Sequence, residues 1–142
     1  MNYLGLDLGT KTLGLAISKG VIATTLKTIR YDDIDKLIEQ LNEIILDNKI
    51  DIIVLGMPKN MNNTIGPRAI ETLEFKQKLE NLNYNVVLQD ERLSTVSAHN
   101  YMIKADLSRK KRKEKVDALA ATIILQTYLD KENNNERRTN EI

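Results

Sequence analysis

Residues 3–18 read YLGLDLGTKTLGLAIS, two apolar stretches separated by a short turn. Residues 3–8 predict a buried strand, and residues 12–18 predict a second strand after the glycine-containing turn. A single carboxylate, Asp7, stands inside the first apolar stretch. Burying a carboxylate is costly unless it is paired, hydrogen-bonded or bound to a metal. Asp7 is therefore the first candidate for a functional residue.

Apolar periodicity also predicts strands and helices in the rest of the chain. The remaining predicted elements are a strand at 21–29, a helix at 34–45, a strand at 50–56, a helix at 67–82, a strand at 85–89, a short helix with His99 and Tyr101, and a helix at 116–129. The helix at 34–45 has apolar residues at helical spacing and an N-cap at Asp32 or Asp33. This order predicts an α/β layered domain with a mixed five-stranded sheet, made of a three-strand antiparallel meander and two parallel strands.

The composition is that of an ordinary globular domain. The chain has 142 residues, of which 42% are hydrophobic and 29% are charged, so we expect one domain over residues 1–129. The last residues, 130–142, are polar and are predicted to be a disordered tail. No apolar run reaches the roughly 20 residues of a membrane span, and the N-terminus lacks a signal-peptide pattern. We therefore expect a cytoplasmic protein without a membrane partner.

Cysteine and histidine restrict the chemistry that is available. The chain has no cysteine and one histidine, His99. Disulfides, zinc–thiolate sites and thiol nucleophiles are thus excluded. A metal site would have to be built from Asp and Glu, whose oxygens suit magnesium or manganese better than zinc.

Positive charge is concentrated in one segment. The net charge of the whole chain is +1, whereas residues 104–115 hold seven basic and two acidic residues and sum to +5. A local basic patch on a nearly neutral protein points to a polyanion bound at one place, although a solvated basic loop explains the charge equally well.

Acidic residues follow the strands at positions that can converge. Asp7 lies toward the end of the first strand, Asp90 and Glu91 follow the last strand, and Asp117 opens the final helix. Ligands of open α/β sheets gather at the carboxyl ends of strands. Each acid also has a structural explanation, such as a favourable helix dipole for Asp117. Together they predict a pair of divalent metals, roughly 4 Å apart, of the kind that supports phosphodiester cleavage.

Four motifs resemble those of the YqgF/RuvX family of ribonuclease H-like proteins, and the resemblance covers the chain to about residue 129. The motifs are GLDLGTKTLGLAIS (5–18), VLGMPKNMNNTIGPRA (54–69), DERLSTVSA (90–98) and RKKRKEKVDALAATIILQTYL (109–129). The resemblance implies a ribonuclease H-like fold and a nuclease that matures the 5′ end of precursor 16S ribosomal RNA. Members of the family have also been regarded as Holliday-junction resolvases.

The resemblance implies a site made of Asp7, Glu91 and Asp117 as ligands of Mg²⁺ or Mn²⁺, with Asp90 as an alternative to Glu91. Alternation along a strand puts Asp90 and Glu91 on opposite faces, so we expect only one of them to reach the metals. The family motif makes Glu91 the first choice. Where the family commonly reads N-M-D-G-T, this chain has residues 60–64, NMNNT. Because Asn also tolerates the left-handed conformation, we expect the loop to keep its shape.

Basic residues near these acids are the predicted contacts to nucleic acid. They are Lys11, Arg68, Arg92, Arg109, Lys110, Lys111 and Arg112. With five Tyr, one Phe and no Trp, extensive base stacking is not expected, and recognition should rest on backbone and shape. Precursor ribosomal RNA is the first-choice partner and branched DNA the second, for a monomer or a homodimer.

Two other classes of protein compete with the nuclease. A phosphotransferase of the actin–hexokinase type has a similar D-x-G-T loop, but it needs two such domains and this chain supplies one. A binding module that holds nucleic acid without cutting it would not need carboxylates at all three positions. The nuclease is therefore the preferred hypothesis.

Overall fold

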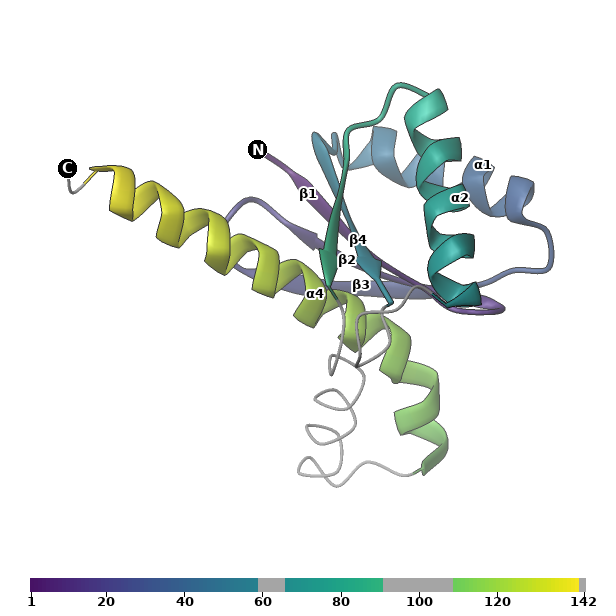
Figure 1. Ribbon diagram of the computed structural model, residues 1–142. Coiled ribbons are helices and arrows are strands. Elements are labelled where there is room, and N and C mark those ends of the chain that lie inside the picture. The colour runs from purple at the N-terminus through teal and green to yellow at the C-terminus, as the bar shows by residue number, and fades with distance from the viewer. Residues whose placement is uncertain (59–65, 91–108, 141–142) are drawn as a thin grey trace.

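The computed structural model describes residues 1–58, 66–90 and 109–140, and within the last range it describes the side chains of residues 118–134. Five strands and three helices lie in these ranges (Figure 1). They are β1 (Tyr3–Leu8), β2 (Thr12–Ser18), β3 (Ala23–Arg30), α1 (Ile34–Asp47), β4 (Ile52–Met57), α2 (Pro67–Asn81), β5 (Val86–Asp90) and α4 (Arg109–Asn140).

The strands form one mixed sheet in the order β3-β2-β1-β4-β5. β1 pairs with β2 antiparallel and with β4 parallel, and β5 adds parallel to β4. The hairpin register places Asp7 opposite Gly14, and the last pair of β4 and β5 is Met57 with Asp90. β1 therefore lies in the middle of the sheet, and its carboxyl end lies beside those of β4 and β5.

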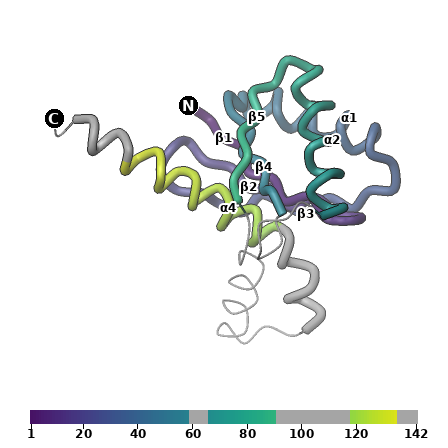
Figure 2. Tube along the Cα trace, in the orientation of Figure 1, coloured from purple at the N-terminus to yellow at the C-terminus, as the bar shows by residue number. Residues whose placement is uncertain are grey.

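Helices α1 and α2 cover one face of the sheet and α4 covers the other (Figure 2). The α1/α2 face holds the larger core, to which β1 contributes Leu4, Leu6 and Leu8. Leu37 and Leu41 of α1 and Phe75 of α2 pack into this core. Each helix thus buries one stripe of apolar residues, as an amphipathic helix on a sheet must.

On the opposite face of β1, the absence of a side chain at Gly5 allows α4 to lie close to the strand. A Cβ atom built on Gly5 would lie 2.7 Å from Leu125 Cβ and 3.0 Å from the Ala121 carbonyl oxygen. The rings of Tyr3 and Tyr128 meet nearby with their centroids 6.1 Å apart. Glycine is therefore required at residue 5 because backbone and helix approach each other there.

The caps of the first two helices follow from their sequences. Asp33 caps α1 by accepting a hydrogen bond at Oδ1 from the Asp35 amide, at 2.9 Å. Pro67 occupies the first turn of α2, where its missing N–H is not needed.

The structure confirms the predicted mixed five-stranded sheet, and the strands at 3–8 and 12–18 have the predicted bounds. The final helix is longer than predicted at both ends, since α4 begins at Arg109 and continues to Asn140. The backbone of residues 130–140 is thus helical, and the division of the chain at residue 129 stays a prediction. Leu129 is the last apolar residue that α4 buries, but Asn133 Nδ2 still donates to the Gly20 carbonyl, at 3.4 Å. The predicted short helix with His99 and Tyr101 lies outside the described residues.

No helix in the described ranges contains a stretch that is long and apolar enough to cross a membrane.

Candidate functional site

Asp7 is a buried carboxylate on the α4 face of the sheet. Its side chain alternates with those of Leu6 and Leu8, which enter the α1/α2 core, so it points to the side of α4. Asp7 is 6% exposed, whereas most carboxylates in folded proteins are solvated. The structure therefore confirms the burial of Asp7 that the sequence pattern predicts.

The residues next to Asp7 in the two neighbouring strands are glycines. Gly14 pairs directly with Asp7 across the hairpin, and Gly56 follows Leu55, the partner of Leu6 in β4. Neither glycine puts a side chain next to the carboxylate. Beyond Gly56 lies its partner in β5, Gln89, whose side chain is buried.

Gln89 was not among the residues predicted from the sequence. It lies on the same face as Asp7 because it pairs with Gly56 and follows Leu88 by one residue. Its Nε2 donates to the Asp90 carbonyl oxygen at 3.3 Å, and the residue is 6% exposed. A glutamine at the end of a strand carries no sequence signal of its own, and only its burial in the structure distinguishes it.

Asp90 lies on the face opposite to Asp7. It is the last residue of β5 and pairs with Met57, and along β5 it alternates with Gln89. Val86, four residues earlier and on the same face, belongs to the α1/α2 core. The sheet therefore separates Asp90 from Asp7, and Glu91, the residue after it, lies outside the described residues.

Asp117 lies in α4, whose course along β1 runs toward the Asp7 end of the sheet. From Tyr3 to Gly5 of β1, the nearest part of α4 moves from Tyr128 to Leu125 and Ala121. Asp117 precedes Ala121 by about one helical turn. The backbone of α4 therefore carries residue 117 toward the end of β1 where Asp7 lies.

Basic residues predicted to contact nucleic acid occupy three places. Lys11 is exposed in the turn between β1 and β2. Arg68 lies in the first turn of α2 and donates from Nη2 to the Leu8 carbonyl oxygen, at 3.0 Å. Residues 109–112 form the first turn of α4, and Arg92 lies outside the described residues.

Among the described residues, no three His, Cys, Asp or Glu side chains gather into a group that could hold a metal ion. Of the three predicted ligands, the described side chains include that of Asp7 alone. Its burial among glycines, in a chain without cysteine, suits an oxygen-liganded divalent cation better than a thiolate site.

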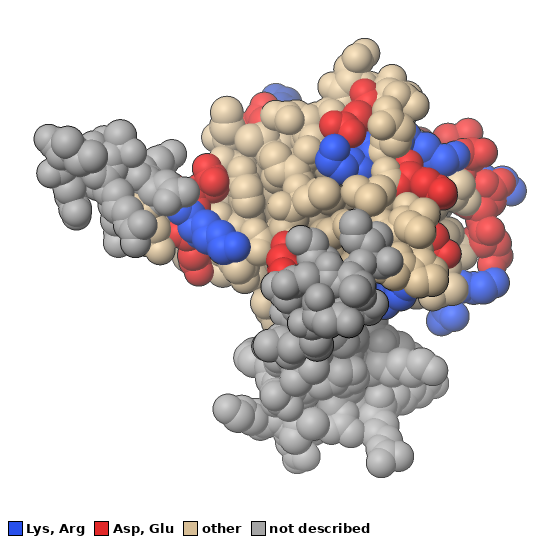
Figure 3. All heavy atoms as spheres, viewed as in Figure 1, with Lys and Arg blue, Asp and Glu red and all other residues tan. Residues whose placement is uncertain are grey.

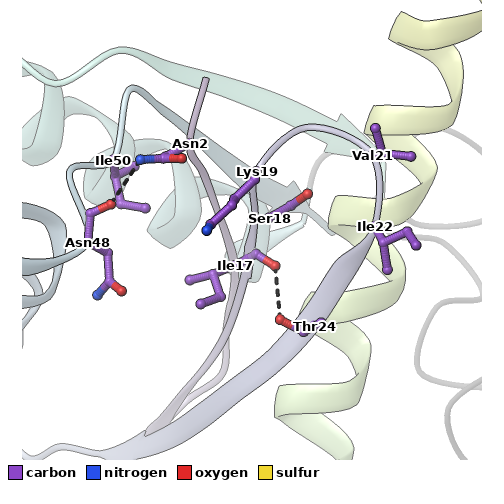
Figure 4. A pocket seen from close by; sticks show the side chains of 9 residues that line it. All are labelled: Asn2, Ile17, Ser18, Lys19, Val21, Ile22, Thr24, Asn48 and Ile50. Atoms are coloured by element: carbon purple, nitrogen blue, oxygen red, sulfur yellow. Dashed lines mark hydrogen bonds between the residues drawn. The ribbon is translucent and has the colours of Figure 1, made fainter.

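A pocket of about 460 Å³ lies at the other end of the sheet (Figure 4). Ile17, Val21, Ile22 and Ile50 supply its apolar walls, and Asn2 and Lys19 are among its polar residues. Ser18, another lining residue, pairs with Tyr3 at the start of β1, whereas Asp7 lies near the end of that strand. The pocket is therefore separate from the Asp7 site.

Comparison with known proteins places this arrangement in a family. A family model described as "RuvX: Holliday junction resolvase" matches residues 1–131. The chain belongs to the RuvX family. The resemblance drawn from the four motifs is thereby confirmed.

Several RuvX relatives carry the name "Putative pre-16S rRNA nuclease". The protein from Geobacillus sp. strain WCH70 is 50% identical over 135 residues, which cover 92% of this chain and 98% of the relative. The relative from Bacillus pumilus is 52% identical with the same coverage. The relative from Listeria innocua is 47% identical over 138 residues, covering 94% of this chain and all of the relative. The expectation of a nuclease family agrees with these names.

Solved structures confirm the fold. The RuvC protein of T. thermophilus, in complex with a Holliday junction substrate, matches with a TM-score of 0.59 and 14% identity over 93% of this chain and 96% of RuvC. The Fowlpox virus resolvase, in complex with Holliday junction DNA, matches with a TM-score of 0.58 and 13% identity over 92% of this chain and 98% of the resolvase. The RuvX chain thus has the ribonuclease H-like fold of these resolvases.

Proposed function

We propose that this chain is a metal-dependent nuclease that processes the 5′ end of precursor 16S ribosomal RNA in the cytoplasm. The names of relatives that are 50% and 52% identical over 92% of the chain support the substrate. The observation that carries the chemistry is the buried carboxylate of Asp7 at the carboxyl end of the central strand. That edge of an α/β sheet is where ligands bind.

Asp7, Glu91 and Asp117 are the proposed ligands of Mg²⁺ or Mn²⁺, with two ions as the expected number. Such ions prepare the attacking water and stabilise the leaving oxygen in phosphodiester hydrolysis. Asp7 supplies a carboxylate that its strand holds in place, and the neighbouring Gly14 leaves room for a phosphate to approach. Lys11, Arg68, Arg92 and residues 109–112 are the proposed contacts to the RNA backbone.

Asp90 is the less suitable ligand because it lies on the face of β5 opposite to Asp7. Glu91 is therefore preferred. The isosteric variants Asp90→Asn and Glu91→Gln test this choice. We expect Asp90→Asn to cut RNA at close to the wild-type rate, and Glu91→Gln to lose metal-dependent cleavage. The reverse result would assign the ligand to Asp90.

Cleavage of labelled precursor 16S RNA in Mg²⁺ and in Mn²⁺ is the experiment that tests the function. We expect wild-type protein to cut the RNA and Asp7→Asn to be at least about 100-fold slower, because the variant loses a carboxylate ligand. Asp47→Asn is the matched control, since it removes a carboxylate from the exposed end of α1. Equal rates for wild-type protein and Asp7→Asn would remove Asp7 from the site.

Cleavage of branched DNA is the second candidate activity, and the family description favours it. A four-way DNA junction belongs in the same assay for this reason. Cleavage of the junction and not of the RNA would overturn the proposed substrate. Symmetric cleavage of a junction needs two active sites, so a dimer would then be expected in sedimentation.

A further inference from the structure

The turn that follows Asp7 is held by more hydrogen bonds than its length requires. We call residues 9–11 the Asp7 loop. The loop closes on itself because the Gly9 amide donates to the Thr12 carbonyl oxygen, at 2.7 Å. Such a contact is sufficient to reverse the chain between two antiparallel strands. Further bonds to the loop therefore call for an explanation other than chain reversal.

Tyr31 binds the Asp7 loop at two points. It directly follows β3, and its amide donates to the Lys11 carbonyl oxygen at 3.0 Å, which extends the pairing of β2 and β3 by one position. Its phenol Oη donates to the Gly9 carbonyl oxygen at 2.7 Å. Burial, and next the charge of Glu71, raise the pKa of this phenol, with Arg68 acting in the opposite direction. The hydroxyl thus keeps its proton, and with it the hydrogen bond to Gly9, throughout the neutral pH range.

Arg68 binds the adjacent peptide from a different direction. Its Nη2 donates to the Leu8 carbonyl oxygen at 3.0 Å. Arg68 lies in the first turn of α2, which contains no acidic residue, and a cation at the N-terminus of a helix is electrostatically unfavourable. The bond to Leu8 is a favourable contact that offsets this unfavourable position of the arginine.

Together these contacts hold the two carbonyl groups that come directly after Asp7. The Leu8 and Gly9 carbonyls are bound by side chains from α2 and from the end of β3, elements that lie far apart in the sequence. A metal ligand must be held to within about 0.5 Å of its productive position. Fixing the main chain one and two residues beyond Asp7 restricts the direction of its carboxylate.

We propose that Tyr31, together with Arg68, is a positioning residue that fixes Asp7 for metal binding by holding the Leu8 and Gly9 carbonyls. The proposal rests on the proposed function, because it requires Asp7 to be a metal ligand. Tyr31 acts through the main chain and does not itself touch metal or RNA. Arg68 has further guanidinium N–H groups, so a contact to RNA and the bond to Leu8 are compatible.

The test uses the full chain and the variant Tyr31→Phe, which removes only the phenol hydroxyl. Tyr84→Phe is the matched control. Tyr84 is a half-buried tyrosine that packs against the same core, in the connection between α2 and β5. Two quantities are measured without RNA: the affinity for Mn²⁺, by electron paramagnetic resonance, and the hydrogen exchange of amides 8–12. In Tyr31→Phe we expect the Kd for Mn²⁺ to rise about 10-fold, the loss typical of residues that orient metal ligands. Exchange should become faster in residues 8–12 alone.

A third measurement separates positioning from simple destabilisation. Cleavage of RNA by Tyr31→Phe should recover toward the wild-type rate as Mn²⁺ is raised, with the KM for RNA unchanged. The variant Arg68→Met should shift the Mn²⁺ dependence in the same direction. Unchanged Mn²⁺ affinity in Tyr31→Phe would overturn the proposal, whether or not exchange of the loop becomes faster.

The same data distinguish this proposal from the proposed function. Wild-type protein and Asp7→Asn with equal Mn²⁺ affinity would refute Asp7 as a ligand, and the positioning role would fall with it. A loss of affinity in Asp7→Asn without any loss in Tyr31→Phe would leave the function intact and refute the positioning role alone. Tyr84→Phe should match wild-type protein in both quantities.

Discussion

At the scale of single residues, the carboxyl end of β1 combines a buried carboxylate with a tightly bound main chain. Asp7 is buried on a face where its neighbours in adjacent strands are glycines, so its carboxylate is the main polar group that β1 presents to α4. The two residues after it are held by Tyr31 and Arg68. The carboxylate and the side chains that bind the following carbonyls thus come from different parts of the sequence.

Tyr31 gives a prediction about alkaline pH. Burial and Glu71 raise the pKa of its phenol above the ordinary value of about 10. At pH values between the ordinary pKa of the unfolded chain and the raised pKa of the folded chain, only the folded chain keeps the phenol proton. The free energy of unfolding therefore falls as pH rises through this range. We expect this fall to be less steep in Tyr31→Phe. Urea denaturation of both proteins at several pH values above 10 measures it, and identical slopes would contradict it.

At the scale of elements, the packing of α4 on β1 determines how residue 117 approaches the end of β1. α4 reaches β1 at Gly5, and the same helix carries Asp117 toward Asp7. The atoms that limit this approach are Leu125 Cβ and the Ala121 carbonyl oxygen, neither of which can move without the helix. The spacing between β1 and α4 is therefore set by a glycine.

Gly5→Ala should displace α4 as a whole. We expect the free energy of unfolding to fall by about 1–3 kcal/mol, the usual cost of overpacking, and cleavage to fall as well. Thr25→Ala is the control, because it removes the contact of 2.8 Å between the hydroxyls of Thr25 and Thr122, at a cost of about 1 kcal/mol. Thr25→Ala should lose stability but keep the cleavage rate. Equal losses of cleavage rate in the two variants would show that activity follows stability and not the spacing between β1 and α4.

At the scale of the whole molecule, the sequence makes α1 acidic and the beginning of α4 basic. α1 carries an exposed acidic row, Asp35, Glu39, Glu43 and Asp47, among the charged side chains around α1 and α2 (Figure 3). The first turns of α4 contain the basic run at 109–115. We expect this basic run to attract an approaching polyanion.

Replacing Lys110, Lys111 and Arg112 by Ala tests the role of the basic run. We expect RNA binding to weaken most at low salt, and the slope of log K against log salt to decrease by about 2, given three contacts to a single strand. The control is a variant in which the exposed residues Lys36, Lys49 and Lys131 are replaced by Ala, which changes the net charge by the same amount. A wild-type slope after the change at 110–112 would exclude these residues from the binding surface.

Much of this architecture could be predicted from the sequence, for a physical reason. The strands at 3–8 and 12–18 and the helix after Asp33 depend on local apolar periodicity and local caps, which the sequence displays directly. The burial of Asp7 was predictable because charge within an apolar strand is rare.

Other features depend on tertiary contacts that leave no local pattern. The polar end of α4 remains helical beyond Leu129, and its Asn133 binds the Gly20 carbonyl oxygen. The positions of Tyr31 and Gln89 beside the site follow from strand pairing and packing. The assignment of Glu91 and Asp117 as ligands stays a prediction.

The central place of β1 in the sheet also affects how the protein loses activity. β3 and β5 are the edge strands, and each can open without breaking a hydrogen bond of β1, since β2 and β4 flank it on both sides. Local fluctuations in a protein concentrate at such edges, while central strands open only with the whole domain. The strand that carries Asp7 should therefore be among the last to open, whereas Tyr31 and Glu91, which follow the edge strands β3 and β5, should be displaced earlier. Cleavage should thus be lost at a lower urea concentration than the secondary structure of the domain.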